Sequence, residues 1–385
     1  MQTYIESKPR YEILDGLRGV AAIVVVLFHM FECYSKDQVQ QIINHGYLSV
    51  DFFFALSGFV VAYAYDDRWG RMTLWDFFKR RFVRLHPMAI FGTLLCACFF
   101  YLNIGPTYPL VGETPWYILL LVTLWCLTLI PLPPRFDIRG WGCTNPVNDP
   151  TWTLQFEYAA NILYALVLRR LSKIGLAVCC LIAAFFTVSL TMNWDFFDLL
   201  HDRGYAAYTV IGGWTLTGPQ VYIGFIRLAC PFLIGMLLAR MGKFIRLDGG
   251  FYWCCLLILL MTFMPRIGGY DALWMNGLYE AFCIIVLFPI ILSIGAGSQI
   301  RSRRGQSICK FLGFISYPLY ITHFVYIYLL WTFKGYHPDA PTGTVVTLCA
   351  GLFLAAIATA YAAMKLYDIP VREYLKEKWL HKVKK

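Results

Sequence analysis

Two side chains that rarely enter a membrane, Arg18 and His29, lie in the apolar stretch YEILDGLRGVAAIVVVLFHM at residues 11–30. An arginine at the centre of a membrane-spanning helix costs roughly 2.5–3.5 kcal/mol on insertion scales, so it normally faces a protein interior or a wet cavity. At about 100° per residue, the spacing of these positions returns to nearly the same helix face, about 16 Å further along the axis. The stretch therefore predicts one helix that carries a cation at one depth and a candidate general base at another.

Other polar side chains in or beside apolar stretches form two layers when they are sorted by predicted depth. The outer layer holds two imidazoles, two carboxylates and a hydroxyl: His29, Asp51, Ser57, Glu157 and His323. A histidine held by a carboxylate can take a proton from a hydroxyl near neutral pH, because the carboxylate orients the ring and stabilises the imidazolium. The same residues would equally suit an interhelical polar clamp or the proton relay of a transporter.

The inner layer is cationic and consists of Arg18, Arg80, Arg81, Arg84 and His86. Guanidinium groups match phosphate oxygens in a bidentate way and keep their charge, so this layer predicts a site for a ligand that carries phosphate. Arginines also mark the cytoplasmic ends of spanning helices whatever the function of the protein. Orientation alone is therefore a sufficient alternative explanation of this layer.

The elements that must position these residues are membrane helices. Of the 385 residues, 59% are apolar, 17% are aromatic and only 15% are charged, whereas about a quarter of the residues in soluble proteins are charged. Apolar runs long enough to cross about 30 Å of hydrocarbon recur along the chain, and no polar segment remains for a separate domain. The sequence therefore predicts an all-α, polytopic membrane protein with a single integral domain over residues 1–385.

About ten spanning helices are predicted, with both termini in the cytoplasm. The basic residues behind the net charge of +10 lie in short loops and a tail at about 370–385, which the positive-inside rule assigns to the cytoplasm, so nucleic acid is not expected as a partner. Residues 116–132 are apolar enough to span but would place the basic loop 169–173 outside, and they are predicted to be re-entrant or interfacial. The predicted spans are 13–33, 48–66, 87–104, 152–168, 175–192, 221–240, 250–264, 278–296, 310–331 and 343–366.

Four predicted external loops are rich in Trp, Tyr, Gly, Pro and Asn: 32–47, 105–151, 195–220 and 265–277. Aromatic rings with polar neighbours suit stacking against sugars, but Trp and Tyr also gather at the interface of most membrane proteins. The thirteen cysteines lie mostly inside apolar segments and are expected to act as small hydrophobic residues. Close pairs such as Cys96 and Cys98 lack the partners of a zinc site, so no metal site is predicted.

Six motifs, in order along the chain, resemble those of the acyltransferase-3 family of transmembrane acyltransferases. They are LDGLRGVAAIVVVLFH with Arg18 and His29, SVDFFFALSGFVVAY with Ser57, FFKRRFVRLHP with Arg81 and Arg84, PTWTLQFEYAANILYAL with Trp152 and Glu157, FLGFISYPLYITHF with Tyr320 and His323, and KLYDIPVREYL with Asp368. Thr153 and Asp368 stand where the family tends to have Ser and Glu. Each motif alone is weak, but the set covers most of the chain.

The resemblance implies transfer of an acyl group, most often acetyl, from acyl-coenzyme A on the cytoplasmic side to a hydroxyl of a glycan or glycolipid on the far side. By its motif His29 would be the catalytic base and Glu157 would polarise the site, and Asp51 joins these catalytic candidates from its place in the outer layer. The candidates for binding the donor are Arg18, Arg80, Arg81 and Arg84. The candidates for lining the site are Ser57, Trp152, Tyr320 and His323.

A proton-coupled transporter or exporter is the alternative function, although the two halves show no self-similarity of the kind expected from inverted repeats. Direct transfer and an acyl-histidine intermediate on His29 both fit the residues. The resemblance also implies a lipid bilayer as the environment and the bacterial inner membrane as the location. The acceptor, the acyl group and the oligomeric state stay open.

Overall fold

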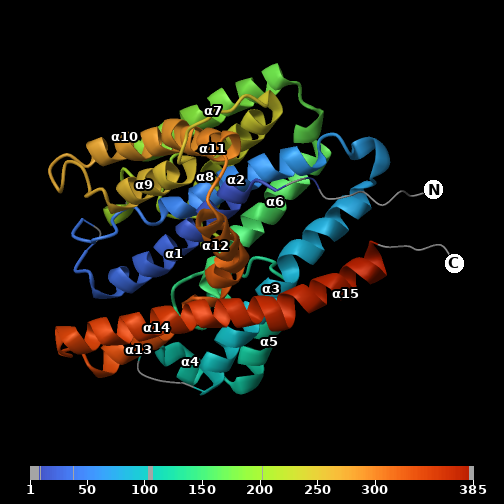
Figure 1. Cartoon of the computed structure of the whole chain (residues 1–385). Coiled ribbons are helices and arrows are strands. Elements are labelled where there is room, and N and C mark those ends of the chain that lie inside the picture. Colours follow the sequence, from blue (N-terminus) through green and yellow to red (C-terminus); the bar gives the residue numbers. More distant parts are fainter. Residues whose placement is uncertain (1–7, 9, 38, 103–106, 202, 381–385) are drawn as a thin grey trace.

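The computed structural model describes residues 8, 10–37, 39–102, 107–201 and 203–380, and every regular element in these ranges is a helix (Figure 1). The predicted all-α class is therefore confirmed. The first eight α-helices are α1 (Glu12–Tyr34), α2 (Leu48–Tyr65), α3 (Leu74–Leu102), α4 (Pro109–Glu113), α5 (Trp116–Leu127), α6 (Trp152–Leu166), α7 (Lys173–Thr191) and α8 (Gly218–Met241). The others are α9 (Gly250–Phe263), α10 (Trp274–Phe282), α11 (Phe288–Gly297), α12 (Arg303–Thr322), α13 (Phe324–Tyr336), α14 (Thr342–Ala363) and α15 (Ile369–Trp379).

The structure supports a polytopic membrane protein but does not confirm ten spans. Seven helical stretches of the described residues are long and apolar enough to cross a membrane: α1, α2, α3, α7, α8, α10 with α11, and α14 with α15. An eighth results if α12 and α13 count as one span. The predicted spans 152–168 and 250–264 correspond to α6 and α9, which have 15 and 14 residues, and α5 has 12. At about 1.5 Å per residue these three helices are shorter than the roughly 30 Å of hydrocarbon.

The structure differs from the predicted helices at three places that bear on the site. The arginine-rich segment 68–84 was expected to be a loop, but α3 already begins at Leu74, so its arginines lie at regular helical spacing. The basic tail continues α14 as the helix α15 after a π-helical turn at Met364–Asp368. The predicted span 310–331 is bent by 50° between α12 and α13, and His323 lies at the bend, where its ring contacts the carbonyl of Tyr320.

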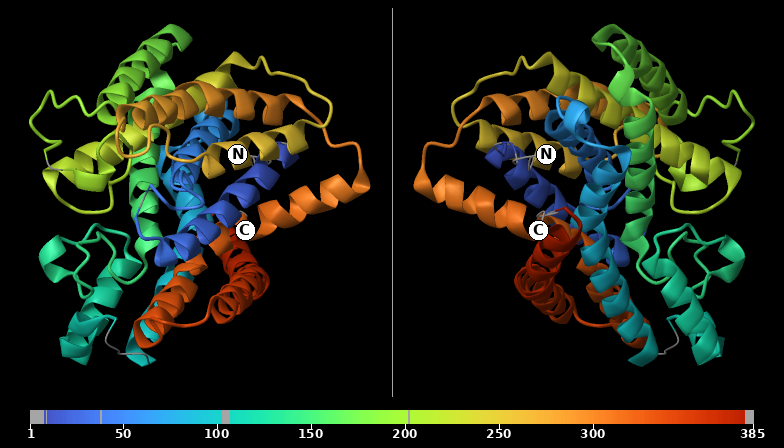
Figure 2. Two further views of the ribbon diagram at one scale, coloured as in Figure 1. Left: turned by 90° about the vertical axis from the view of Figure 1, so that its left-hand side faces the viewer. Right: turned by 90° about the vertical axis from the view of Figure 1, so that its right-hand side faces the viewer.

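α1 and α2 form the middle of the bundle, with the later helices arranged around them (Figure 2). α1 packs chiefly on α12, and α2 packs chiefly on α8. Both contacts depend on glycine, because a Cβ at Gly19 would lie 2.4 Å from the carbonyl oxygen of Leu312 and one at Gly58 would lie 2.0 Å from that of Phe232. Small residues let membrane helices approach this closely. The glycine in the Ser57-Gly58-Phe59 motif is thus explained by helix packing.

The start of α1 and the end of α15 lie on the same side of the bundle (Figure 1). Lys8, before α1, pairs with Asp67 just after α2 on this side, with 2.8 Å between the charged atoms. The opposite side carries the end of α1 and the loops that follow α5 and α7. The two ends of α1 therefore face different environments, as the positions of Arg18 and His29 require.

Candidate active site

A cavity of about 350 Å³ lies beside the last turns of α1 and is walled mainly by aromatic rings. Its lining includes four tryptophans, Trp141, Trp152, Trp214 and Trp331, and the predicted site residues His29 and Tyr320. We call this space the aromatic cavity. Pockets for small molecules are typically concave and largely apolar, with a few convergent polar groups, and the aromatic cavity has this character.

His29 is held by a carboxylate that the sequence analysis did not identify. Its Nδ1 lies 2.8 Å from Oε2 of Glu32, one helical turn further along α1, and both side chains line the aromatic cavity. The contact requires Nδ1 to donate, which leaves Nε2 of the neutral ring as an acceptor. The spacing of three residues on one helix was the signal in the sequence, because residues at that spacing lie on the same face.

His323 lies next to His29, as the predicted outer layer required. The two rings are stacked, with 5.7 Å between their centroids and 23° between their planes. Nδ1 of the fully buried His323 contacts the carbonyl of Tyr320 at 2.8 Å, whereas its Nε2 is buried without a hydrogen-bond partner among the described atoms. His323 therefore packs behind His29, and the bend between α12 and α13 gives it this position.

Loops distant in sequence close the aromatic cavity. The backbone of Thr144, in the loop after α5, donates to the carbonyl of Trp214, in the loop before α8, at 2.7 Å. An isolated antiparallel bridge joins Cys143 to Thr215 beside this bond. Three of the four predicted external loops with many aromatic residues thus contribute to one wall, since Tyr47, Trp141 and Trp214 all line the cavity.

Two cavity groups outside the helices stay protonated. Burial raises the pKa of the Cys143 thiol well above its usual range, which argues against a nucleophilic thiolate here. Burial and then the Glu280 carboxylate raise the pKa of the Tyr47 hydroxyl well above its usual range. That hydroxyl donates a hydrogen bond to Glu280. Neither group is therefore a base for a neighbouring hydroxyl.

Asp51 forms a buried ion pair with Arg227 of α8, and the partner of His29 is instead Glu32. The Asp51 oxygens accept from Nε and Nη2 of Arg227 at 3.1 and 2.7 Å, and the two side chains are 0% and 2% exposed. Arg227 also donates to the carbonyls of Gly212 and Tyr47. The sequence analysis missed Arg227, although an arginine in the middle of an apolar helix is the same signal that singled out Arg18.

Glu157 was predicted to share a layer with His29, but the structure brings it to the arginines. Its Oε1 accepts from Nη2 of Arg81 at 2.6 Å and from the hydroxyl of Ser57 at 3.0 Å. The Arg81 side chain is 3% exposed. The predicted depth was wrong for Glu157 because α6 begins at Trp152 inside the protein, so that its first turns already reach the level of Arg81.

Three of the four predicted donor-binding arginines, Arg18, Arg81 and Arg84, form a group that we call the arginine cluster. Arg81 and Arg18 lie close enough to Arg84 for their positive charges to repel it. Arg18 forms an ion pair with Asp15 at 3.0 Å. No ion pair of Arg84 is present among the described residues. Arg80 precedes Arg84 by one helical turn, and its partly buried Nε has no partner in the described part of the chain. The cluster therefore retains unneutralised positive charge.

α6 links the aromatic cavity to the arginine cluster. Trp152, its first residue, lines the cavity, and Glu157 binds Arg81. Their separation of five positions corresponds to about 8 Å along a helix. Thr153, on the same turn, shares a hydrogen bond of 2.9 Å with the hydroxyl of Tyr320. A long, thin ligand could therefore contact both sites.

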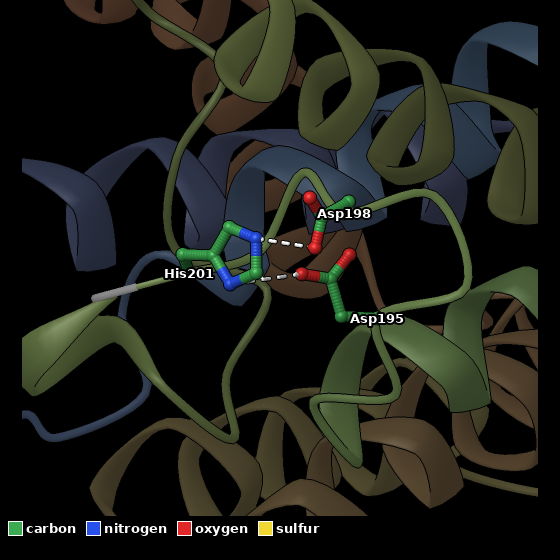
Figure 3. A group of neighbouring side chains, drawn as sticks. All are labelled: Asp195, Asp198 and His201. Carbon is green, nitrogen blue, oxygen red and sulfur yellow. Dashed lines mark ion pairs between the residues drawn. The ribbon is translucent and has the colours of Figure 1, made fainter.

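A third polar group lies outside both sites, in the loop after α7 (Figure 3). His201 contacts Asp198 at 2.5 Å and Asp195 at 3.6 Å. Their ligand atoms lie within 4.8 Å of one another, but the His201 and Asp198 side chains are 63% and 86% exposed. Hydrogen bonds from the backbone of Leu199 and Leu200 help to keep the pKa of Asp195 below its usual value despite partial desolvation. This arrangement is a solvated ion-pair group on the surface.

Comparison with known proteins extends the similarity over nearly the whole chain. The family model of the acyltransferase domain of the acyltransferase-3 family matches residues 11–364. Protein 2 in the picA locus of Rhizobium radiobacter is 36% identical over 173 residues, which are 42% of this chain and 84% of that protein. No solved structure matches the chain.

Two further relatives have names that state an activity. The acyltransferase MdmB of Streptomyces mycarofaciens is 31% identical over 175 residues, 43% of this chain and 41% of that protein. The O-acetyltransferase OatA of Staphylococcus aureus is 35% identical over 92 residues, 23% of this chain and 14% of that protein. The matched segment thus spans less than half of MdmB and about a seventh of OatA.

Proposed function

Because the chain belongs to the acyltransferase-3 family and is a membrane acyltransferase, we propose that it moves an acyl group, most simply acetyl, from acyl-coenzyme A to a hydroxyl of a glycan or glycolipid. One observation carries this proposal: His29 and Glu32 form a hydrogen-bonded pair in the wall of the aromatic cavity. A second supports it, namely the unneutralised charge of the arginine cluster about 16 Å away along α1.

In the proposed reaction His29 is the general base. The bond from Nδ1 to Glu32 leaves Nε2 to accept the proton of the acceptor hydroxyl as its oxygen attacks the thioester carbonyl. The C–S bond then breaks, and the thiolate takes the proton back from the imidazolium. Glu32 is a positioning residue in this scheme, since it orients the ring and stabilises its charged form.

The acceptor is proposed to bind in the aromatic cavity. Sugar rings present apolar C–H faces and hydroxyl edges, which suit Trp141, Trp214 and Trp331 as stacking surfaces and Tyr47 as a polar partner. The name of the Staphylococcus aureus relative, an O-acetyltransferase, supports a hydroxyl as the acceptor group. Apart from Glu32, which holds His29, the charged groups that line the cavity are Arg227 and Asp149, and they are already paired with Asp51 and Arg139.

The donor is proposed to bind through its phosphates at the arginine cluster. Guanidinium forks match phosphate oxygens and hold their charge inside a protein. The pantetheine arm would then run beside α6 and bring the thioester from Arg81 and Glu157 toward His29. The positive loops at this end support the cytoplasm as the side from which the donor enters.

The test uses membranes that contain the protein, a glycan acceptor and acetyl-coenzyme A, with release of free thiol and acetylation of the glycan as readouts. His29→Ala should lower the rate by about 10²- to 10⁴-fold, the usual contribution of a positioned base. His201→Ala, which removes an exposed imidazole outside the cavity, is the matched control. Undiminished acetylation by His29→Ala at an equal protein level would refute the role of His29.

A further inference from the structure

The C-terminal helix α15 reaches the arginine cluster, although residues 369–379 lie beyond the region that the family model matches. α15 packs against α3, and the ring of Trp379 lies 5.7 Å from that of Phe82. Arg372 is close enough for its charge to act on Arg84 together with those of Arg81 and Arg18. Four guanidinium groups from three helices therefore gather at one place.

Arg372 is held in position by a buried carboxylate. Its Nη1 donates to Oδ2 of Asp368 at 2.8 Å, one turn earlier, and the Asp368 side chain is 0% exposed whereas that of Arg372 is 24% exposed. A buried partner fixes one edge of the guanidinium and leaves its Nε without a partner among the described residues. Asp368 thus acts as a positioning residue for Arg372.

The cluster contains buried donors that no described atom satisfies. Nε of Arg372, of Arg81 and of Arg80 is in each case buried without a hydrogen-bond partner in the described ranges. Leaving a buried charged donor unpaired is costly, so such groups normally meet a ligand, an ion or water. Carboxylates neutralise Arg18, Arg81 and Arg372, but Arg84 has no such partner among the described residues. An anion would satisfy the free donors and offset the charge of Arg84 at the same time.

We propose that α15 forms one wall of the donor site and that Arg372 binds a phosphate group of the nucleotide donor. The inference rests on the proposed function and adds a binding residue to it. The headgroup of an anionic lipid offers the same phosphate chemistry, so the experiment must separate these two sources. We assign the phosphate to the donor because Arg372 lies close enough for its charge to act on Arg84 and its side chain is only 24% exposed.

The test compares two donors, acetyl-coenzyme A and S-acetylpantetheine, which has the same thioester and arm but no phosphate. The double variant Asp368→Asn/Arg372→Gln removes both charges and avoids an unpaired buried carboxylate. Its ratio of kcat/KM for acetyl-coenzyme A to that for S-acetylpantetheine should fall by roughly 10- to 100-fold, the range for a hydrogen bond to a charged group. Arg372→Lys, which keeps the charge, should recover part of the ratio.

Lys378→Gln is the matched control, since it removes one exposed cation from the same helix and should leave the ratio unchanged. Equal losses with both donors would show that Arg372 only supports the fold and would overturn the proposal. An unchanged ratio would overturn it as well. The assay is repeated in phosphatidylcholine vesicles with and without phosphatidylglycerol, and an Arg372 effect that appears only with the anionic lipid would overturn the assignment to the donor.

The outcomes also separate this inference from the proposed function. A wild-type protein that releases thiol from neither donor would refute the proposed function. Coenzyme A alone then still tests Arg372, because a ligand that binds the folded state raises the unfolding temperature. That increase should be present in wild type and reduced in the double variant. Equal increases in both proteins would refute the inference.

Discussion

The aromatic cavity and the arginine cluster both contain arginines and carboxylates, but they use them differently. In the cavity wall, Arg227 gives two hydrogen bonds to Asp51 and two more to the carbonyls of Gly212 and Tyr47. In the cluster, by contrast, Arg81 retains a buried Nε without a partner among the described residues, and Arg84 has no ion pair there. The hydrogen bonds and charge of Arg227 are satisfied within the protein, whereas the charge of Arg84 has no carboxylate partner among the described residues.

This difference indicates what each region can recognise. A saturated ion pair offers little to a ligand, so the cavity must act through its rings, its neutral hydroxyls and the His29–Glu32 pair. Unsaturated guanidinium groups in a partly buried site favour a multiply charged anion such as a phosphate. Two chemically different substrates can thus be bound at the two ends of one helix without competing for the same residues.

The largest expected effect comes from breaking the saturated pair. Asp51→Asn leaves the buried charge of Arg227 without its partner and should lower the free energy of unfolding by about 3–5 kcal/mol. The unfolding temperature of the purified protein in detergent measures this. Asp51→Asn/Arg227→Gln, which removes both charges, should be more stable than the single variant. Arg301→Ala, which breaks an exposed pair with Asp248, should change the free energy by at most about 1 kcal/mol.

If Asp51 were instead a catalytic group of the cavity, Asp51→Asn would abolish transfer while the unfolding temperature stayed that of wild type. That result would contradict the structural role of the Asp51–Arg227 ion pair. It would also restore the grouping of Asp51 with His29 that the sequence suggested.

A second prediction concerns the unsaturated region. Arg84→Gln should raise the KM for acyl-coenzyme A by roughly 10- to 100-fold, because a charged hydrogen bond to phosphate is lost. The KM for the acceptor should stay close to that of wild type. Steady-state kinetics with each substrate varied in turn separate these values, with Arg301→Gln as a control on the same predicted side. A larger effect on the acceptor would mean that the cluster faces the other ligand.

A third prediction concerns the His29–Glu32 pair and a substitution that weakens it without removing the base His29. Glu32→Gln should lower kcat by about 10-fold, less than the loss for His29→Ala, because Nε2 of His29 can still accept a proton. The Glu32 side chain is 32% exposed, so solvent partly replaces its electrostatic effect. Glu32→Asp should recover part of the rate, and Glu32→Gln should add nothing to His29→Ala. An additional loss in the double variant would show that Glu32 acts independently of the histidine.

The smallest effect is expected from replacing one tryptophan that lines the aromatic cavity. Trp331→Ala should raise the acceptor KM by roughly 2- to 10-fold, since one aromatic contact contributes about 0.5–1.5 kcal/mol beyond its area. The KM for the donor should not change. Trp253→Ala, at an exposed position on α9 outside the cavity, is the matched control. A selective rise in the donor KM would contradict the division of roles between the two regions.

Local spacing explains which parts of the site could be predicted. Arg18, Arg81 and Arg84 lie close enough for their charges to interact, as expected from arginines near the same end of two helices. Glu32 was missed, although its spacing from His29 places it on the same face of α1. Arg227 was not predicted either, because it lies in the apolar stretch 221–240, outside the six motifs.

The partner of Asp51 and the depth of Glu157 could not be predicted in the same way. Depth was inferred from helix ends, and α6 begins inside the protein rather than at a membrane surface. The bend between α12 and α13 at His323 was not predicted either, because the apolar stretch 310–331 continues through it without interruption. Helix lengths and pair partners of this kind are set by packing between segments far apart in the chain.

The sequence by itself determined that this protein is a helical membrane acyltransferase with a cation and an imidazole on one helix face. Hydrophobic runs, helical periodicity and ordered motifs are local properties, and they survive any arrangement of the helices. Only the tertiary structure decided that Asp51 neutralises Arg227, that Glu157 joins Arg81, and that α15 returns to the arginines. A buried charge takes whichever partner the packing brings within hydrogen-bond distance, because leaving it unpaired is too costly.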